Sequence, residues 1–439
     1  MLHRKRTDDS KLLATIRLLM LIATNCSMLD KPTLGSYLAI IAAELTLKVG
    51  LSPYSSVALY MWAVVEVFSG NRERGYRLGT LSLKLLSHIP CKEAECAVVG
   101  GGAAWIFYMK RKIRDLSDPC TKASNGGFQV GDITSVAISL GSHLNVLLWT
   151  GENLLSLKRR MLEFHRRIRD FGQDQNGHLM LINPTIQFIL NMQNQEEEWK
   201  DLTFLTGEIM NENEYLTKSN CRKKGWYFTI TYFFKMILSY TFGFDEEAEE
   251  YLNYILNARS AYTKHTYLSL PCNFYAGMLS YRLYRSTGRK FYLQRARKFK
   301  KFLVKEHSYG NPNAAPHLKI LEVEELSFKS EIASDILNAC TNTIRIQSIE
   351  GFSYLEALAN EQAYRILCHL GCATANVYLK QAMLIYRDKW GATAKYTWLL
   401  ERMENLNVLQ KHRPEGSVKL HLSTEGTKVR EEISFEQKS

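Results

Sequence analysis

Proline is scarce in this chain: only 9 of its 439 residues are proline. A proline is tolerated in the first turn of a helix but disrupts a helix interior, so its position marks a boundary. The prolines that fall between segments of apolar periodicity are Pro32, Pro53, Pro90, Pro119, Pro184, Pro271, Pro312 and Pro316. Long segments with the strict alternation of a half-buried strand are also lacking. Together the two absences predict an all-α fold.

A long uncharged apolar run is missing as well. A transmembrane helix needs about 18 or more predominantly apolar residues, and the best candidate, residues 55–68, is shorter and contains Glu66. At the N-terminus, the basic residues 3–6 precede an apolar stretch that Arg17 interrupts. No small-residue cleavage site follows, so an amphipathic first helix fits better than a signal peptide. We therefore expect no membrane span.

No disulfide framework is evident either. The 9 cysteines are odd in number and share no spacing, which favours a reducing compartment. We therefore expect a cytoplasmic protein. The net charge of +12 is compatible with nucleic-acid binding but is also common in ordinary scaffolds. We favour the scaffold and do not expect nucleic acid as a partner.

What is present is a recurring helical pattern. Ala375, Leu379 and Ala382 place small, large and small side chains on one helix face, and Ala333, Leu337 and Cys340 repeat this 42 residues earlier. Recurrence at a fixed period is typical of helical repeat arrays. We predict a superhelical array of antiparallel helix hairpins, a TPR-like α-solenoid. Its period of 42–45 residues is longer than the ~34 residues of an ordinary tetratricopeptide repeat.

The array is expected to occupy residues 11–407, after a flexible N-terminus at 1–10 and before a disordered polar tail at 408–439. Within it, 118–128 is rich in Asn, Gly and Ser and is predicted to be a loop. Residues 225–244 are aromatic and β-branched, which would suit a strand, but their length favours a helix.

Three segments carry a resemblance to a known group of proteins: 310–326, 349–367 and 378–399, with Glu356–Ala359 and Trp390–Ala392 the most telling. They resemble the tetratricopeptide-like helical region of large multidomain signalling proteins. Those proteins also contain a protein-kinase-like module, an AAA-type predicted ATPase and often a sensor histidine kinase.

Looser similarity extends the resemblance to about residues 50–405. It implies a role in signal transduction and association with ATPase or kinase modules. The catalytic motifs of those modules are missing: the sequence has no G-x-x-x-x-G-K-[ST] phosphate loop and no H-R-D and D-F-G pair. The resemblance therefore carries over no catalytic residue.

Several residue groups could carry chemistry, but each has a simpler structural interpretation. Gly100–Gly102 lacks the lysine of a phosphate loop and suits close helix packing or a helix break. Cys368, His369 and Cys372 are too few for a closed zinc site. The aromatic residues Trp226, Tyr227, Phe228, Tyr232, Phe233 and Phe234 are predicted to lie in the core, with a peptide-binding role as the alternative.

Charged groups are interpreted in the same way. The acidic residues Glu196–Glu198, Glu246, Glu247, Glu249, Glu250, Glu322, Glu324 and Glu325 are taken as helix starts and solvated faces. Two basic stripes could hold phosphates, but each fits the solvent face of an amphipathic helix. They consist of Lys158, Arg159, Arg160, Arg166, Arg167 and Arg169, and of Arg289, Lys290, Arg295, Arg297, Lys298, Lys300, Lys301 and Lys305.

The sequence thus predicts a non-catalytic protein-interaction or regulatory module in signal transduction. Its protein or peptide partner is expected on the concave face, and no catalytic, cofactor-binding or metal-binding residue is assigned. Two alternatives remain: an α/α-barrel enzyme and a nucleic-acid-binding helical array.

Overall fold

The computed structural model describes residues 4–28, 31–172, 179, 182–196, 198–218, 226–258, 262–330 and 332–411, and this part is all-helical, with one isolated bridge between Arg6 and Leu51. The predicted all-α class is confirmed. The first helices are α1 (Ser10–Met28), α2 (Pro32–Val49), α3 (Ser55–Phe68), α4 (Arg72–His88), α5 (Lys92–Glu95), α6 (Gly102–Trp105), α7 (Ser117–Gln129), α8 (Ile133–Leu147), α9 (Leu154–Asp170) and α10 (Asn183–Gln193). They are followed by α11 (Glu212–Lys218), α12 (Trp226–Phe242), α13 (Asp245–Ala258), α14 (Tyr262–His265), α15 (Ser269–Thr287), α16 (Lys290–Ser308), α17 (Ala314–Leu326), α18 (Ala333–Glu350), α19 (Ser353–His369), α20 (Ala375–Leu384) and α21 (Thr393–Lys411).

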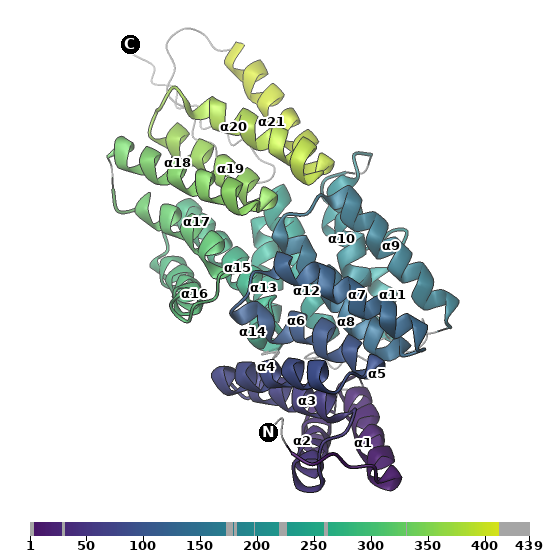
Figure 1. The fold of residues 1–439 in the computed structure, drawn as a ribbon. Helices are drawn as coiled ribbons and strands as arrows, with labels where there is room; N and C mark the ends of the chain where they lie inside the picture. The colour runs from purple at the N-terminus through teal and green to yellow at the C-terminus, as the bar shows by residue number, and fades with distance from the viewer. Residues whose placement is uncertain are drawn as a thin grey trace, which may run out of the picture.

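Consecutive helices pack as pairs along an elongated molecule, with α1–α4 at one end and α18–α21 at the other (Figure 1). The clearest pairs are α3 with α4, α12 with α13, α15 with α16, and α19 with α20. Gly243, Gly288 and Gly371 end the first helix of the last three pairs with positive φ angles of 83°, 67° and 70°. The chain therefore turns at these glycines between the two helices of each pair. The last residues of α21 fall in the segment expected to be a tail, and residues 412–439 lie outside the described part.

The ambiguous segment 225–244 is a helix, α12, as predicted. Phe233, Phe234, Met236, Ile237 and Leu238 are each 0–1% exposed. A helix with neighbours on every side can be apolar all round, so its sequence lacks the alternating polar face that marks a surface helix.

The loop predicted at 118–128 is wrong, because these residues form α7. Cys120, Ala123, Ser124 and Gly127 are buried at helical spacing. A Cβ on Gly127 would stand 2.5 Å from Val136 Cγ2 and 3.2 Å from Cys96 Cβ. The small residues that suggested a loop are there because α7 lies very close to α8 and to the 96–101 segment.

Gly100–Gly102 has the packing role expected of it. Gly100 and Gly101 end a π-helical segment, Cys96–Gly101, which runs directly into α6. A Cβ on Gly100 would lie 2.7 Å from Ser139 Cβ on α8. The glycines therefore let two helix backbones approach closely.

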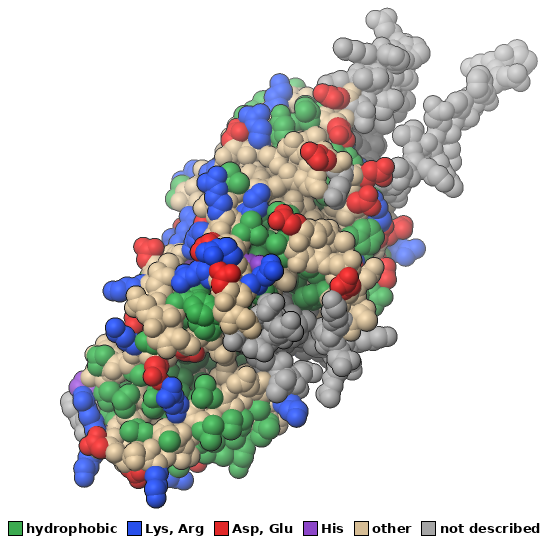
Figure 2. Space-filling view, turned by 90° about the vertical axis from the view of Figure 1, so that its right-hand side faces the viewer, with side chains coloured by type: hydrophobic (Ala, Val, Ile, Leu, Met, Phe, Trp, Pro, Cys, Tyr) green, Lys and Arg blue, Asp and Glu red, His purple; other side chains and the backbone are tan. Residues whose placement is uncertain are grey.

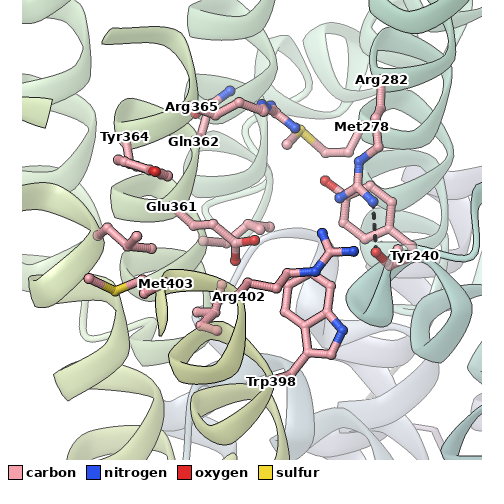
Figure 3. Close-up of a pocket in the computed structure, with 14 residues that line it drawn as sticks. Tyr240, Met278, Arg282, Glu361, Gln362, Tyr364, Arg365, Trp398, Arg402 and Met403 are labelled. Carbon is pink, nitrogen blue, oxygen red and sulfur yellow. Dashed lines mark hydrogen bonds between the residues drawn. The ribbon is translucent and has the colours of Figure 1, made fainter. Parts of the chain in front are cut away.

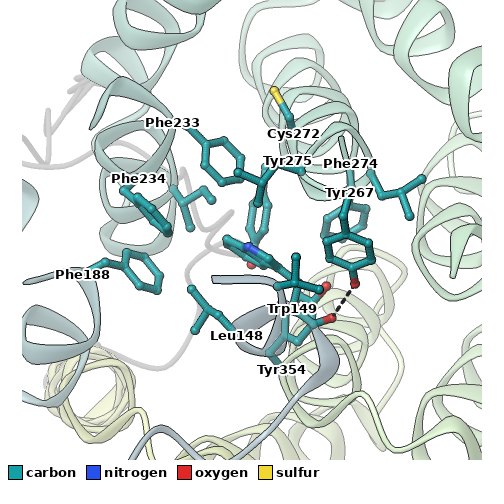
Figure 4. Packing of buried hydrophobic residues seen from close by; sticks show 14 of the residues in the cluster. Leu148, Trp149, Phe188, Phe233, Phe234, Tyr267, Cys272, Phe274, Tyr275 and Tyr354 are labelled. Atoms are coloured by element: carbon teal, nitrogen blue, oxygen red, sulfur yellow. Dashed lines mark hydrogen bonds between the residues drawn. The ribbon is translucent and has the colours of Figure 1, made fainter. Parts of the chain in front are cut away.

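The core is built around Trp149, which is fully buried just after α8 (Figure 4). Its ring centroid lies 5.4 Å from Phe233, 6.1 Å from Phe234 and 5.8 Å from Tyr354. Two residues of the aromatic group at 226–234 are thus core residues, as predicted. Aromatic rings at these distances add favourable edge and stacking contacts to their hydrophobic burial.

Contacts between residues about 200 positions apart join the two halves of the chain. Ile113 N donates to Asn313 Oδ1 at 3.2 Å, and Thr393 Oγ1 donates to Gln193 O at 2.9 Å. In addition, Ser353 Oγ donates to Gly151 O. These helix pairs therefore contact more than their neighbours in sequence, and α19 and α21 are tied to the first half of the molecule.

The α1–α2 end carries exposed apolar side chains. Leu18, Leu21 and Tyr37 are 58%, 49% and 62% exposed, and Figure 2 shows hydrophobic side chains gathered at this lower end of the molecule.

Elsewhere, Ile133–Thr150 is long and apolar enough to cross a membrane, but 78% of it is buried inside the fold. The expectation that the chain has no membrane span stays a prediction.

Candidate functional site

A pocket of about 110 Å³ lies between α12, α15, α19, α20 and α21 (Figure 3). Three arginines and one carboxylate line it, together with aromatic side chains: Tyr240, Arg282, Glu361, Arg365, Trp398 and Arg402. The partner was expected on the concave face of stacked hairpins. In this part of the chain, α21 also packs on α12 and leaves a partly enclosed pocket instead.

Equivalent positions on successive helices form the wall. Arg282 Nη1 on α15 donates to Tyr240 O on α12 at 2.8 Å, across a separation of 42 residues. Gln362 Nε2 on α19 donates to Ile320 O on α17 at 3.0 Å, again across 42 residues. The period found in the sequence is therefore present as repeated contacts between the first helices of neighbouring pairs.

Arg282 is the most deeply buried of the lining arginines, with a side chain that is 9% exposed. It pairs with Asp245 Oδ1 at 2.9 Å, and its guanidinium lies 3.6 Å from the centroid of the Tyr240 ring. Its Nε has no hydrogen-bond partner within the described part of the chain. A buried N–H without a partner is costly, so this arginine is held in place at the expense of stability.

Arg285 and Arg365 share one carboxylate, that of Glu324. Arg285 Nη2 lies 3.0 Å from Glu324 Oε2, and Arg365 Nη2 contacts Glu324 Oε1. Burial lowers the pKa of each arginine to about 10. For Arg365, the positive charges of Arg285 and Arg282 lower the pKa further. The Nε of Arg365 also lacks a partner among the described residues.

Glu361 is the only carboxylate among the described residues that line the pocket, and it is already engaged. Lys395 Nζ donates to Glu361 Oε1 at 3.0 Å, and Tyr386 Oη donates to Oε2 at 2.9 Å. Lys395 is 2% exposed, and burial lowers its pKa to about 8 although Glu361 acts in the opposite direction. Glu361 therefore compensates Lys395 and forms no ion pair with an arginine among the described residues.

Arg402 has no carboxylate of its own. Its guanidinium lies 4.1 Å from the centroid of the Trp398 ring. No hydrogen bond or ion pair of its side chain occurs within the described residues. Burial, and then the charge of Arg282, lower its pKa, whereas the carboxylates of Glu361 and Asp245 act in the opposite direction. In Figure 3 its guanidinium points into the pocket, between Glu361 and Tyr240.

Adding these groups gives the charge of the site. The cations are Arg282, Arg285, Arg365, Lys395 and Arg402, and the carboxylates are Asp245, Glu324 and Glu361. Five positive groups face three negative ones, so the site has an excess of two positive charges. Like charges held together out of water destabilise each other, and an anion would relieve them.

The pocket is open to solvent on one side. The side chains of Arg365 and Glu361 are 21% and 20% exposed, and Arg402 is half-buried. A charged side chain can thus enter without unfolding a helix, and it would meet several guanidinium N–H donors. Such donors favour carboxylate or phosphate oxygens.

The interpretation of the acidic residues as solvated faces is wrong for two of them. Glu324 is 1% exposed and Glu325 5% exposed. Glu324 joins Arg285 and Arg365, whereas Glu325 Oε1 lies 3.0 Å from Arg297. Both side chains face neighbouring helices because α17 lies between α15 and α19 and has no wide solvent face.

The second basic stripe is also partly internal. The side chain of Arg295 is 9% exposed and pairs with Glu249 at 2.9 Å. The stripe on α9 fits its predicted solvent face better, since the side chain of Arg166 is 61% exposed and pairs with Glu163 and Asp170 on the same helix. Neither stripe reaches the pocket, and no group of three potential metal ligands occurs within the described residues, Cys368 and Cys372 included.

Sequence reasoning missed the pocket arginines. Arg282 and Arg365 each lie between two apolar residues in sequence, as in Tyr281-Arg282-Leu283 and Tyr364-Arg365-Ile366. An arginine between apolar residues on successive helices of one array was the available signal, because a charge inside an apolar stripe needs a partner.

Comparison with protein-family models, with curated proteins and with solved structures finds no match for this chain. Its function is therefore argued from the pocket.

Proposed function

We propose that this chain is a non-catalytic helical-repeat module that binds an acidic segment of a protein partner in the pocket of Arg282, Arg365 and Arg402. The observation that carries the proposal is the excess of two positive charges on the inner wall of the array. Natural proteins rarely bury unpaired cations unless they serve a ligand. A TPR-like α-solenoid would supply such a wall from the first helix of each pair.

The arrangement supports binding better than catalysis. General acid–base chemistry needs a group within reach of the substrate that can exchange a proton. Glu361 already accepts hydrogen bonds from Lys395 and Tyr386, and the other lining charges are guanidinium groups. The pocket of about 110 Å³ also suits one side chain rather than a nucleic-acid strand.

The setting is proposed from the sequence. The resemblance of residues 310–399 to the helical region of large signalling proteins supports a role in signal transduction, with ATPase or kinase modules as associates. The scattered cysteines support a cytoplasmic location.

Short fluorescent peptide libraries of acidic, neutral and basic composition test this proposal. We expect the acidic library to bind most tightly and its affinity to fall with added salt, because screening weakens contacts between charges. Arg402→Met should weaken that binding about tenfold, since a hydrogen bond to a charged group contributes about 1.5–3 kcal/mol. Fluorescence anisotropy measures both effects.

The matched control is Arg166→Met, which removes an arginine from α9 outside the pocket and should leave the affinity unchanged. Equal affinity for acidic and basic libraries would refute the proposal. Peptides recovered with altered mass would instead favour an enzyme.

A further inference from the structure

The charge of the pocket suggests more than an acidic side chain, and this inference rests on the proposed function. Asp245 compensates Arg282, and Glu361 compensates Lys395. Glu324 is divided between Arg285 and Arg365, and Arg402 forms no ion pair among the described residues, although Glu361 and Asp245 attract it from a distance. Two positive charges are thus left over in this group of side chains, of which Arg365 and Arg402 line the cavity.

We propose that the occupant is a phosphorylated side chain of a partner protein, bound by Arg365 and Arg402 with Arg282 at the base of the pocket. A phosphomonoester carries about −1.5 to −2 charges at pH 7 and three strong acceptor oxygens. An aspartate or glutamate carries one charge and would leave one cation unpaired. The dianion therefore matches the charge of the site, whereas a carboxylate does not.

The donors and walls fit such a group. The guanidinium of Arg402 points into the pocket (Figure 3) and forms no ion pair among the described residues, and the side chain of Arg365 is partly exposed beside it. Guanidinium groups bind phosphate through paired N–H donors. Met278, Leu358 and Leu379 supply apolar wall for the stem of the side chain. Because burial and mutual repulsion lower the pKa of Arg365 and Arg402, a dianion would remove an existing electrostatic cost.

The experiment compares peptide libraries that share degenerate flanks and differ in one central residue: phosphoserine, phosphotyrosine, glutamate or alanine. A phosphorylated library should bind at least about tenfold more tightly than the glutamate library. Its affinity should fall as the pH is lowered from 7.5 to 5.5, because the second pKa of a phosphomonoester is about 6. Arg402→Met should remove most of the preference, Arg402→Lys should restore part of it, and Arg166→Met should not change it.

The outcomes separate this inference from the proposed function. Equal binding of phosphorylated and glutamate libraries, both above alanine, overturns the inference and leaves acidic-segment binding intact. If none of the anionic libraries binds, both this inference and the proposed function are overturned. Inorganic phosphate is added as a competitor. If it displaces the phosphopeptide at concentrations as low as those at which the phosphopeptide binds, the pocket is a site for free phosphate, and the assignment to a partner's side chain is overturned. If Arg402→Met leaves the preference for phosphorylated peptides unchanged, the phosphate binds outside this pocket, and the inference is also overturned.

Discussion

Replacing Gly151 by alanine should destabilise the protein by about 3 kcal/mol, through backbone strain plus a clash with packed neighbours. Gly151 has a φ angle of +81°, which costs a residue with a Cβ about 1–2 kcal/mol. A Cβ there would also meet the backbone of α19, 2.9 Å from Phe352 Cα. Backbone atoms cannot move aside as the end of a flexible side chain can, so the turn after Trp149 and the start of α19 have to separate.

Gly131→Ala is the matched control. Gly131 has a similar φ angle of +74°, but a Cβ there would meet nothing within 4 Å. It should therefore show the conformational cost alone, about 1–2 kcal/mol. Thermal unfolding followed by circular dichroism compares the two variants. Equal shifts of the melting temperature would mean that the contact between residues 151 and 353 does not hold the two halves together.

Acid should destabilise the protein well before its carboxylates are protonated. His143 and His317 are 1% and 0% exposed, and burial lowers the pKa of each to about 4 from an ordinary 6.5. Above pH 6.5 both are neutral in the folded and unfolded states, so their contribution is fully present. Below pH 6.5 the unfolded chain takes up the protons first. Stability should then fall by up to about 1.4 kcal/mol per pH unit for each histidine, down to about pH 4.

Burial keeps His317 neutral, although its hydrogen bond to Asn313 O acts in the opposite direction and raises its pKa. Asn313 O can only accept, so Nδ1 of His317 donates to it at 3.0 Å. In the neutral ring Nε2 then accepts from Tyr354 Oη at 2.7 Å. His317→Gln should reduce the slope of stability against pH between 6.5 and 5. An unfolding free energy that stays constant over this range in the unmodified protein would show that neither histidine is held neutral.

The sequence was informative where periodicity alone decides structure. Several prolines fall in the first turns of helices, as expected, and the 42-residue recurrence of Ala333 and Ala375 marks the starts of α18 and α20. It was misleading at residues 118–128, because small residues serve close packing as well as turns, and only the neighbouring helix distinguishes the two.

The candidate site was harder to predict. An arginine such as Arg365 looks the same in sequence whether it faces solvent or a buried carboxylate. Its role depends on Glu324 on another helix, 41 residues away. The excess charge is a property of five helices together, so no local pattern around Arg282, Arg365 or Arg402 could give it.

The central claim is that the pocket keeps unpaired positive charge for a ligand, at some cost to stability. The most direct test is the melting temperature of Arg402→Met without any added anion. We predict that it equals or exceeds that of the unmodified protein, because the substitution removes like-charge repulsion while a methionine can still pack on Trp398. A fall of several degrees would contradict the account, since Arg402 would then be a group that the fold itself requires.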